Sequence, residues 1–302
     1  MTNQFNCCLK MVHYTITHKT EYIYKEPISL CHNIARLIPR SVDRQVCNMS
    51  EIVITPEPDT YKRYEDFYGN HVAYFAIEQD HDKLTVTVTS DIEITPTTIS
   101  LDNCAQTPWE EEAKKIHSNT PEYIDIRQYV PQTAMTEITP EVKAYALQSF
   151  TPGRPLFAAT HDLMHRIYHD FEFKAGLTTI TTPVNETLKL RKGVCQDFAH
   201  LAITCLRSLG LPARYVSGYI ETIQAPGKEK LVGTDASHAW FATYIPDMGW
   251  VEFDPTNNQI PSSQHITIGW GRDYADIAPL KGIILSSRPH KLHVSVDVRR
   301  IG

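Results

Sequence analysis

The sequence lacks long hydrophobic runs, basic clusters and a signal-peptide pattern. Nowhere do 18 consecutive apolar residues occur, so no segment predicts a membrane-spanning helix. The 29 lysines and arginines are outnumbered by 35 acidic residues and form no run longer than two, which argues against a nucleic-acid or anionic-membrane partner. The first twenty residues have no basic stretch followed by an apolar segment. We therefore expect a cytoplasmic protein with no nucleic-acid or membrane partner.

Paired cysteine motifs are also missing. The chain has 7 cysteines, an odd number, and no two of them have the C-x-x-C spacing of a structural zinc site. A secreted disulfide scaffold would be shorter and would usually carry an even number. The sequence therefore predicts free thiols, and the question is which of them is reactive. The cysteines are Cys7, Cys8, Cys31, Cys47, Cys104, Cys195 and Cys205.

Metal-binding motifs give only one weak signal. Neither H-E-x-x-H nor a D-x-D-x-D-G calcium loop occurs. His161, His165 and His169 share one helical face at spacings of four, where imidazoles can hold a transition metal. A solvated helix face explains the same spacing more simply, because the apolar stripe lies elsewhere. We expect no metal and no cofactor.

Length and periodicity predict an α+β protein of two domains. A chain of 302 residues with 42% hydrophobic content can fill two cores. Alternating apolar residues predict strands in 12–24, 51–55 and 84–94, and Gly69-Asn70 predicts a hairpin turn. We therefore place a β-rich N-terminal domain at 1–105.

The rest of the chain divides into three parts. Helical patterns over 109–117 and 139–150 define a connector, 106–155, and a second helix is expected from residue 156 to about 171. The core is placed at 156–260 and a C-terminal extension at 261–302, with a final strand at 292–298.

Cys195 lies at a position that favours a reactive thiol, the N-terminus of a helix. It begins an amphipathic helix that ends at Gly210 and Pro212. A helix N-terminus lowers the pKa of a thiol and can hold a developing oxyanion. Cys205 lies within the apolar stripe and is expected to be a small core residue. A nucleophilic cysteine also needs an imidazole and a group that orients it.

His238 and Asp254 can supply these groups only in one hairpin register. A four-residue loop at 246–249 would pair His238 with Asn257 and place Asp254 on the opposite face. A five-residue loop at 245–249 pairs His238 with Thr256 and makes Asp254 its diagonal neighbour. We therefore predict the odd loop or a bulge.

Several motifs together carry a resemblance to a known family. The core motifs are GVCQDFA at 193–199, GLPARYVSGY at 210–219, SHAW at 237–240 and GWVEFDPTN at 249–257, and the others are HKTEYIY at 18–24, LIPR at 37–40, FYGN at 67–70 and GRDYAD at 271–276. The core motifs resemble the bacterial form of the transglutaminase core family, within the papain-like cysteine enzymes. The other motifs resemble the N-terminal region and a C-terminal segment of these bacterial proteins, so the likeness extends from about residue 12 to 300.

The resemblance implies a papain-like transglutaminase core, with a nucleophile-bearing helix packed on an antiparallel sheet. It implies Cys195 as the nucleophile, His238 as general base and then acid, and Asp254 as the residue that orients His238. The expected chemistry is acyl transfer or hydrolysis at amide bonds through a thioester, with a protein or peptide substrate and an amine co-substrate.

Some assignments remain open at this point. Asp197 fits a helix-capping carboxylate better than a contact to the substrate amine, and Gln196 is one candidate for the second oxyanion donor. A cysteine peptidase or amidase with the same core is an alternative, as is a non-catalytic peptide-binding module. The expected oligomeric state stays undefined. Arylamine acetyltransferases are disfavoured because their Arg-Gly-Gly lead-in is absent, and peptide N-glycanases because their C-x-x-C pairs are absent.

Overall fold

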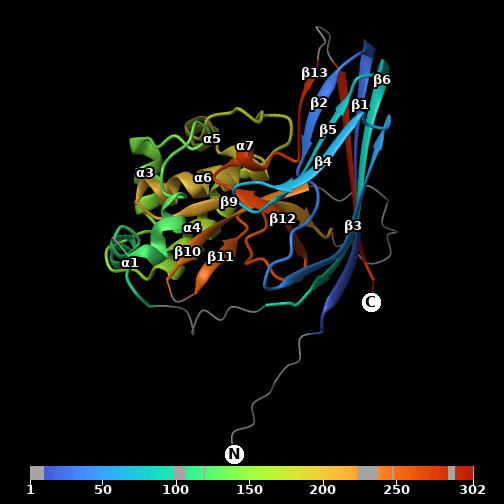
Figure 1. The fold of residues 1–302 in the computed structure, drawn as a ribbon. Helices are drawn as coiled ribbons and strands as arrows, with labels where there is room; N and C mark the ends of the chain where they lie inside the picture. Colours follow the sequence, from blue (N-terminus) through green and yellow to red (C-terminus); the bar gives the residue numbers. More distant parts are fainter. Residues whose placement is uncertain are drawn as a thin grey trace, which may run out of the picture.

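The computed structural model describes residues 10–97, 106–118, 120–222, 237–246, 248–284 and 290–301. In Figure 1 the helices lie on one side of the molecule, a long β-sandwich lies on the other, and the core sheet is between them. No helix in these ranges is long and apolar enough to cross a membrane. The protein has the α+β architecture that the sequence predicts.

The N-terminal domain is a sandwich of two four-stranded antiparallel sheets, with orders β14-β1-β6-β3 and β13-β2-β5-β4. Buried apolar side chains from both sheets, including Phe75, Ile77 and Val86, fill the space between them. The strands are β1 (Val12–Ile28), β2 (Cys31–Ala35), β3 (Gln45–Thr55), β4 (Thr60–Glu65), β5 (His71–Ile77), β6 (His81–Ile94), β13 (Leu280–Ile284) and β14 (His290–Arg300).

The predicted strands and hairpin of this domain are confirmed. The stretches 12–24, 51–55 and 84–94 lie within β1, β3 and β6. The predicted turn joins β4 to β5, and Gly69 adopts a φ of 72°, a left-handed conformation that costs glycine little. The predicted strand at 292–298 lies within β14.

The segment after residue 261 contributes to both parts of the molecule. β12 joins the core sheet, whereas β13 and β14 pair with β2 and β1 of the sandwich. The first and last strands of the described residues therefore lie in the same domain. The long β1 strand is flanked by β6 and by β14, which begins nearly 200 residues after the end of β6.

The core combines helices with a third antiparallel sheet of order β11-β10-β9-β12. α6 is buried over most of its length and contacts β9 and β10 in the largest apolar cluster. The sheet strands are β9 (Ala213–Ile220), β10 (Ser237–Ile245), β11 (Gly249–Phe253) and β12 (His265–Gly271). The helices are α1 (Trp109–Ile116), η2 (Pro121–Tyr123), α2 (Ile124–Arg127), α3 (Pro140–Leu147), α4 (Leu156–Asp170), α5 (Val184–Leu190), α6 (Cys195–Ser208) and α7 (Tyr274–Ile277), and β7 (Glu172–Phe173) pairs in parallel with β8 (Lys192–Gly193).

The sandwich contacts the core sheet through polar groups, a cation–π contact and an apolar cluster that includes Ile16 and Ile266. The side chain of Gln45 exchanges two hydrogen bonds with the backbone of Thr267, at 2.7 and 2.8 Å, as a neighbouring strand would. The guanidinium groups of Arg40 and Arg214 lie 3.5 and 3.7 Å from the ring centroid of Trp270. The N-terminal domain is thus tied directly to β12.

Candidate active site

The candidate nucleophile is the first residue of α6. Val194 has an extended backbone (φ −121°, ψ 178°), and the helix begins at Cys195, which is half-buried. The first N–H groups of a helix have no carbonyl partner inside it, so they give this end a partial positive charge. The Cys195 thiol therefore lies where a thiolate and an oxyanion are both stabilised.

Asp197 holds the start of this helix. Its buried Oδ2 accepts hydrogen bonds from the Val194 N–H at 2.8 Å and from the Thr178 hydroxyl at 2.6 Å. Burial raises the pKa of Asp197 above its ordinary value, although these two hydrogen bonds act in the opposite direction. A Cβ atom on Gly193 would lie 2.8 Å from Asp197, so this position requires glycine. These contacts give Asp197 the capping role.

The Gln196 side chain is engaged by the loop before α5. Its Nε2 donates to the carbonyl of Ile180 at 3.1 Å. The hydrogen bond of Asp197 with Thr178 reaches the same loop, so both side chains anchor it beside the nucleophile.

The β10–β11 hairpin has the odd register that the triad requires. Tyr244 pairs with Trp250 and Ile245 with Gly249, which places the turn at 246–248. Asp247 of this turn lies outside the described residues. The register brings Asp254 beside His238, and the two side chains are joined by a 2.8 Å hydrogen bond between Oδ2 and Nε2.

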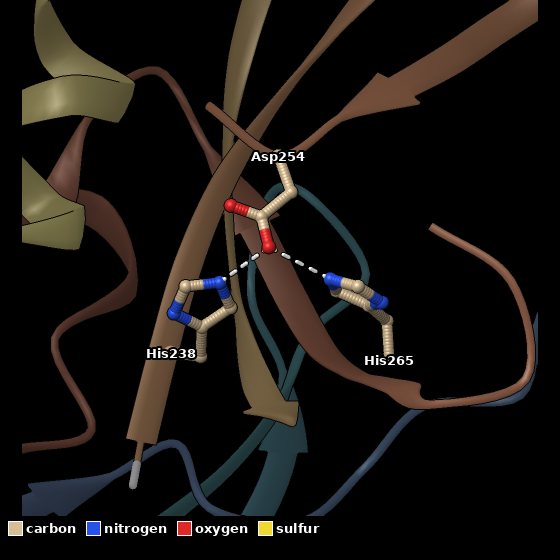
Figure 2. A group of neighbouring side chains, drawn as sticks. All are labelled: His238, Asp254 and His265. Carbon is tan, nitrogen blue, oxygen red and sulfur yellow. Dashed lines mark hydrogen bonds and ion pairs between the residues drawn. The ribbon is translucent and has the colours of Figure 1, made fainter. Parts of the chain in front are cut away.

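The Asp254 carboxylate is fully buried and accepts five hydrogen bonds. Oδ1 accepts from the backbone N–H groups of Thr256 and Asn257. Oδ2 accepts from the amide of Asn257 and from two imidazoles, His238 at 2.8 Å and His265 at 2.9 Å. Figure 2 shows both rings directed at this one oxygen. Burial opposes ionisation, but the hydrogen bonds to the two histidines outweigh it and hold the pKa of Asp254 well below its usual range.

His238 connects this carboxylate to the thiol. Because Nε2 is bonded to Asp254, Nδ1 is the ring nitrogen left for Cys195. Burial lowers the pKa of His238, yet the hydrogen bonds to Asp254 and to Cys195 outweigh burial and raise it above its ordinary value. A raised pKa favours the imidazolium form, which is the partner that a thiolate needs.

Sequence patterns alone do not identify two of these groups, His265 and Asn257. His265 lies on β12, a strand that local alternation alone does not place beside β9. Asn257 belongs to a quoted motif, but its contact with Asp254 depends on the turn that follows β11. A polar residue three positions after the acid was the one available signal, since such side chains often bond back to a turn.

Potential metal ligands gather at one place among the described residues. The donor atoms of His238, Asp254 and His265 all lie within 4.8 Å of one another. In the structure both imidazoles donate to Asp254, so this group already forms a hydrogen-bonded unit. The rings of His165 and His169 on α4 lie 4.2 Å apart, but the face they share with His161 forms no such group of three.

The remaining described thiols differ from Cys195. Cys205 is buried in the core cluster, as expected, and burial raises its pKa to about 12. Cys31 and Cys47 lie in the sandwich, and burial raises both pKa values. Cys7, Cys8 and Cys104 lie outside the described residues.

A cysteine at the start of a helix that packs on an antiparallel sheet, with a histidine and an acid on that sheet, defines a transglutaminase-like core. Sequence comparison agrees. Residues 14–93 match the bacterial transglutaminase-like N-terminal region, and residues 143–255 match the transglutaminase-like superfamily. An uncharacterized protein of Mycobacterium tuberculosis is 41% identical over 292 residues, which cover 94% of this chain and 92% of the relative. The chain belongs to the transglutaminase-like superfamily.

Two further likenesses bear on fold and chemistry. A solved structure from Cytophaga hutchinsonii, described as a "Putative Cysteine Protease", superposes with a TM-score of 0.76 over 97% of this chain and 92% of its own, at 20% identity. This likeness shows that the two proteins share a fold across both domains. A protein-glutamine gamma-glutamyltransferase of Pseudomonas aeruginosa is 36% identical over 72 residues, which are 24% of this chain and 11% of that protein.

Proposed function

We propose that the protein is a cysteine enzyme that transfers or hydrolyses acyl groups from amide bonds through a thioester on Cys195. The observation that carries the proposal is a chain of hydrogen bonds from Asp254 through His238 to Cys195, which lies at the N-terminus of α6. The local likeness to a glutamyltransferase supports a glutamine carboxamide as the acyl donor, in a protein or peptide.

In the proposed reaction each group has one step. The Cys195 thiolate attacks the carbonyl carbon, and the oxyanion that forms lies near the N–H groups at the start of α6. His238, protonated and held by Asp254, donates its Nδ1 proton to the departing ammonia or amine, which leaves the acyl group on sulfur. His238, now neutral, takes a proton from the incoming amine or water as it attacks the thioester. The thiolate departs and the imidazolium is restored.

The identity of the acceptor separates the candidate activities. An amine acceptor gives a transglutaminase, and water gives a deamidase or a peptidase. A site that binds peptides without turnover would be a binding module. The same four outcomes can be measured in one experiment.

We suggest incubating a library of glutamine-containing peptides with the protein, with and without a primary amine, and following masses. Amine adducts indicate transfer, replacement of amide nitrogen by oxygen indicates deamidation, and shorter chains indicate proteolysis. Cys195→Ala should abolish every product, whereas Cys47→Ala, which removes a sandwich thiol, should leave them unchanged. Absence of any Cys195-dependent product would overturn the proposal in favour of a binding module.

A second measurement tests the thiol without a substrate. Iodoacetamide should label Cys195 at neutral pH much faster than Cys205, whose burial raises its pKa to about 12. Equal labelling rates for the two thiols would contradict a catalytic Cys195.

A further inference from the structure

Asp254 binds a second imidazole that the proposed reaction does not use. The Nε2 atom of His265 lies 2.9 Å from the same Oδ2 that accepts a hydrogen bond from Nε2 of His238. The ring centroids of the two histidines are 6.0 Å apart, so one carboxylate oxygen lies between two rings. His265 has no contact with Cys195 among the hydrogen bonds of the described residues, and its effect on the reaction must therefore pass through Asp254.

The surroundings define the protonation state of His265. A carboxylate only accepts, so the hydrogen bond requires a proton on Nε2. The other ring nitrogen, Nδ1, is buried and has no hydrogen-bond partner. A second N–H on Nδ1 would be a buried donor without an acceptor and would give the ring a buried positive charge, so protonation of Nδ1 is disfavoured. Burial also lowers the pKa of His265. This ring is therefore neutral beside a charged His238.

The sandwich domain holds His265 in place. The backbone carbonyl of His265 accepts a hydrogen bond from the Arg44 guanidinium at 3.0 Å. Two residues along β12, Thr267 exchanges two hydrogen bonds with Gln45. Inside the core, the Trp240 ring packs edge-on against the His265 ring, with their centroids 5.1 Å apart. The ring thus has little freedom to leave Asp254.

We propose that His265 is a positioning residue of this site, a neutral imidazole that fixes the Asp254 carboxylate against His238 and so favours the thiolate–imidazolium pair. The inference rests on the proposed function, because it assigns His265 a role in the same chemistry. It also gives the N-terminal domain a part in the site, since Arg44 and Gln45 hold the strand that carries this histidine.

The charged and titratable groups near His265 come from two strands, β10 and β11. Asp254 directly follows β11, His238 is the second residue of β10, and Glu252 on β11 interacts electrostatically with the ring. Glu252 is itself paired with Arg44 at 3.0 Å. If substitution of His265 changes the pH dependence of Cys195 alkylation, the effect must therefore pass through Asp254 and His238.

The test compares two variants. His265→Leu has an apolar side chain of similar size and no hydrogen-bond donor, whereas the amide of His265→Gln can donate to Asp254. The rate of Cys195 alkylation by iodoacetamide is measured from pH 5 to 9 in the full chain. We expect Cys195 in His265→Leu to react about tenfold more slowly than in the wild type at pH 6, where the thiolate depends on its imidazolium partner. The two rates should converge near pH 9, where a thiol ionises without such a partner. His265→Gln should restore most of the rate, while equal melting temperatures exclude a general loss of structure.

Several outcomes would overturn this inference. A folded His265→Leu variant with the wild-type profile removes the positioning role, as does a His265→Gln variant that is as slow as His265→Leu at the same melting temperature. If the wild type itself labels like an ordinary thiol, the proposed function fails instead. If the variants do not fold, ¹⁵N-histidine NMR of the wild type decides: the inference requires a neutral ring protonated on Nε2 from pH 6 to 8, and a titrating or Nδ1-protonated ring contradicts it.

Discussion

At the residue scale, one buried carboxylate organises the site. Asp254 accepts five hydrogen bonds, and the two that reach His238 and His265 link the hairpin to β12. Because five donors surround it, the carboxylate has one favoured orientation and is favoured in its ionised form. Removing its charge should therefore change the chemistry of Cys195 more than it changes the fold.

Asp254→Asn tests this at constant size. The variant loses the negative charge that raises the pKa of His238, while burial, which lowers this pKa, remains. In the wild type the imidazolium persists as pH rises through neutrality and is lost only when pH passes its raised pKa. In the variant this loss should begin at lower pH, and turnover should fall on the order of 10³- to 10⁴-fold.

The measurement is the pH profile of turnover and of Cys195 alkylation. Asp125→Asn, an exposed acid on α2, serves as the matched control and should behave as the wild type. A profile of Asp254→Asn that keeps the high-pH limb of the wild type would show that Asp254 does not support His238.

The proposed triad could be predicted from the sequence, but its support could not. Cys195 follows from a helix start, and the odd loop follows from the alternation of side chains in two adjacent strands. His265 and Ile220 are brought together by the pairing of β12 with β9, which depends on tertiary structure rather than on local pattern. A buried partner on a strand at the opposite edge of the sheet leaves no periodic signal.

At the element scale, the start of α6 is held by the segment after β7 and by the side chain of Asp197. Lys174 donates its backbone N–H to the carbonyl of Gly193 at 2.8 Å, so the segment after β7 runs beside the residue that precedes the helix. Asp197 then closes the helix end through Val194 and ties it to Thr178. The position of Cys195 therefore depends on this cap.

Asp197→Ala should both destabilise the protein and slow Cys195. Loss of a capping side chain costs about 0.5–2 kcal/mol, and the freed helix end should place the thiol less well. Thermal unfolding and Cys195 alkylation measure the two effects together. Asp197→Asn keeps an acceptor oxygen and should lie between the wild type and Asp197→Ala. A higher KM for the amine in Asp197→Asn, with unchanged stability, would instead support a substrate contact.

Element types were predictable where element pairing was not. Alternation and helix periodicity located β1, β6, β14 and α6, because each follows from side chains close in sequence. The addition of β13 and β14 to the N-terminal sandwich joins residues more than 240 positions apart. No local rule identifies such partners, and so the sequence alone predicts only an extension at residues 261–302.

At the scale of the whole molecule, the two domains share a buried polar junction. His18 of β1 is 2% exposed and lies between the Thr20 hydroxyl and the Tyr219 hydroxyl, both at 2.9 Å. Tyr219 belongs to the core sheet, so this histidine spans the interface. Burial lowers the pKa of His18 from 6.5 to about 4. The folded protein therefore holds a neutral ring that the unfolded chain would protonate below pH 6.5.

Acid should consequently weaken the junction. Between pH 6.5 and 4 the unfolded chain binds the proton more readily than the folded one, so stability is lost as pH falls through this window. His18 alone should account for about 2 kcal/mol of the loss between pH 7.5 and pH 5. His18→Gln cannot titrate and should lose that much less, even if it starts from a lower stability at pH 7.5. Urea unfolding at both pH values gives the comparison, with His13→Gln on the same strand as the matched control. If His18→Gln loses as much stability as the wild type, the acid sensitivity arises at other buried histidines, of which His200 is the nearest in chemistry, because burial lowers its pKa to about 4 as well.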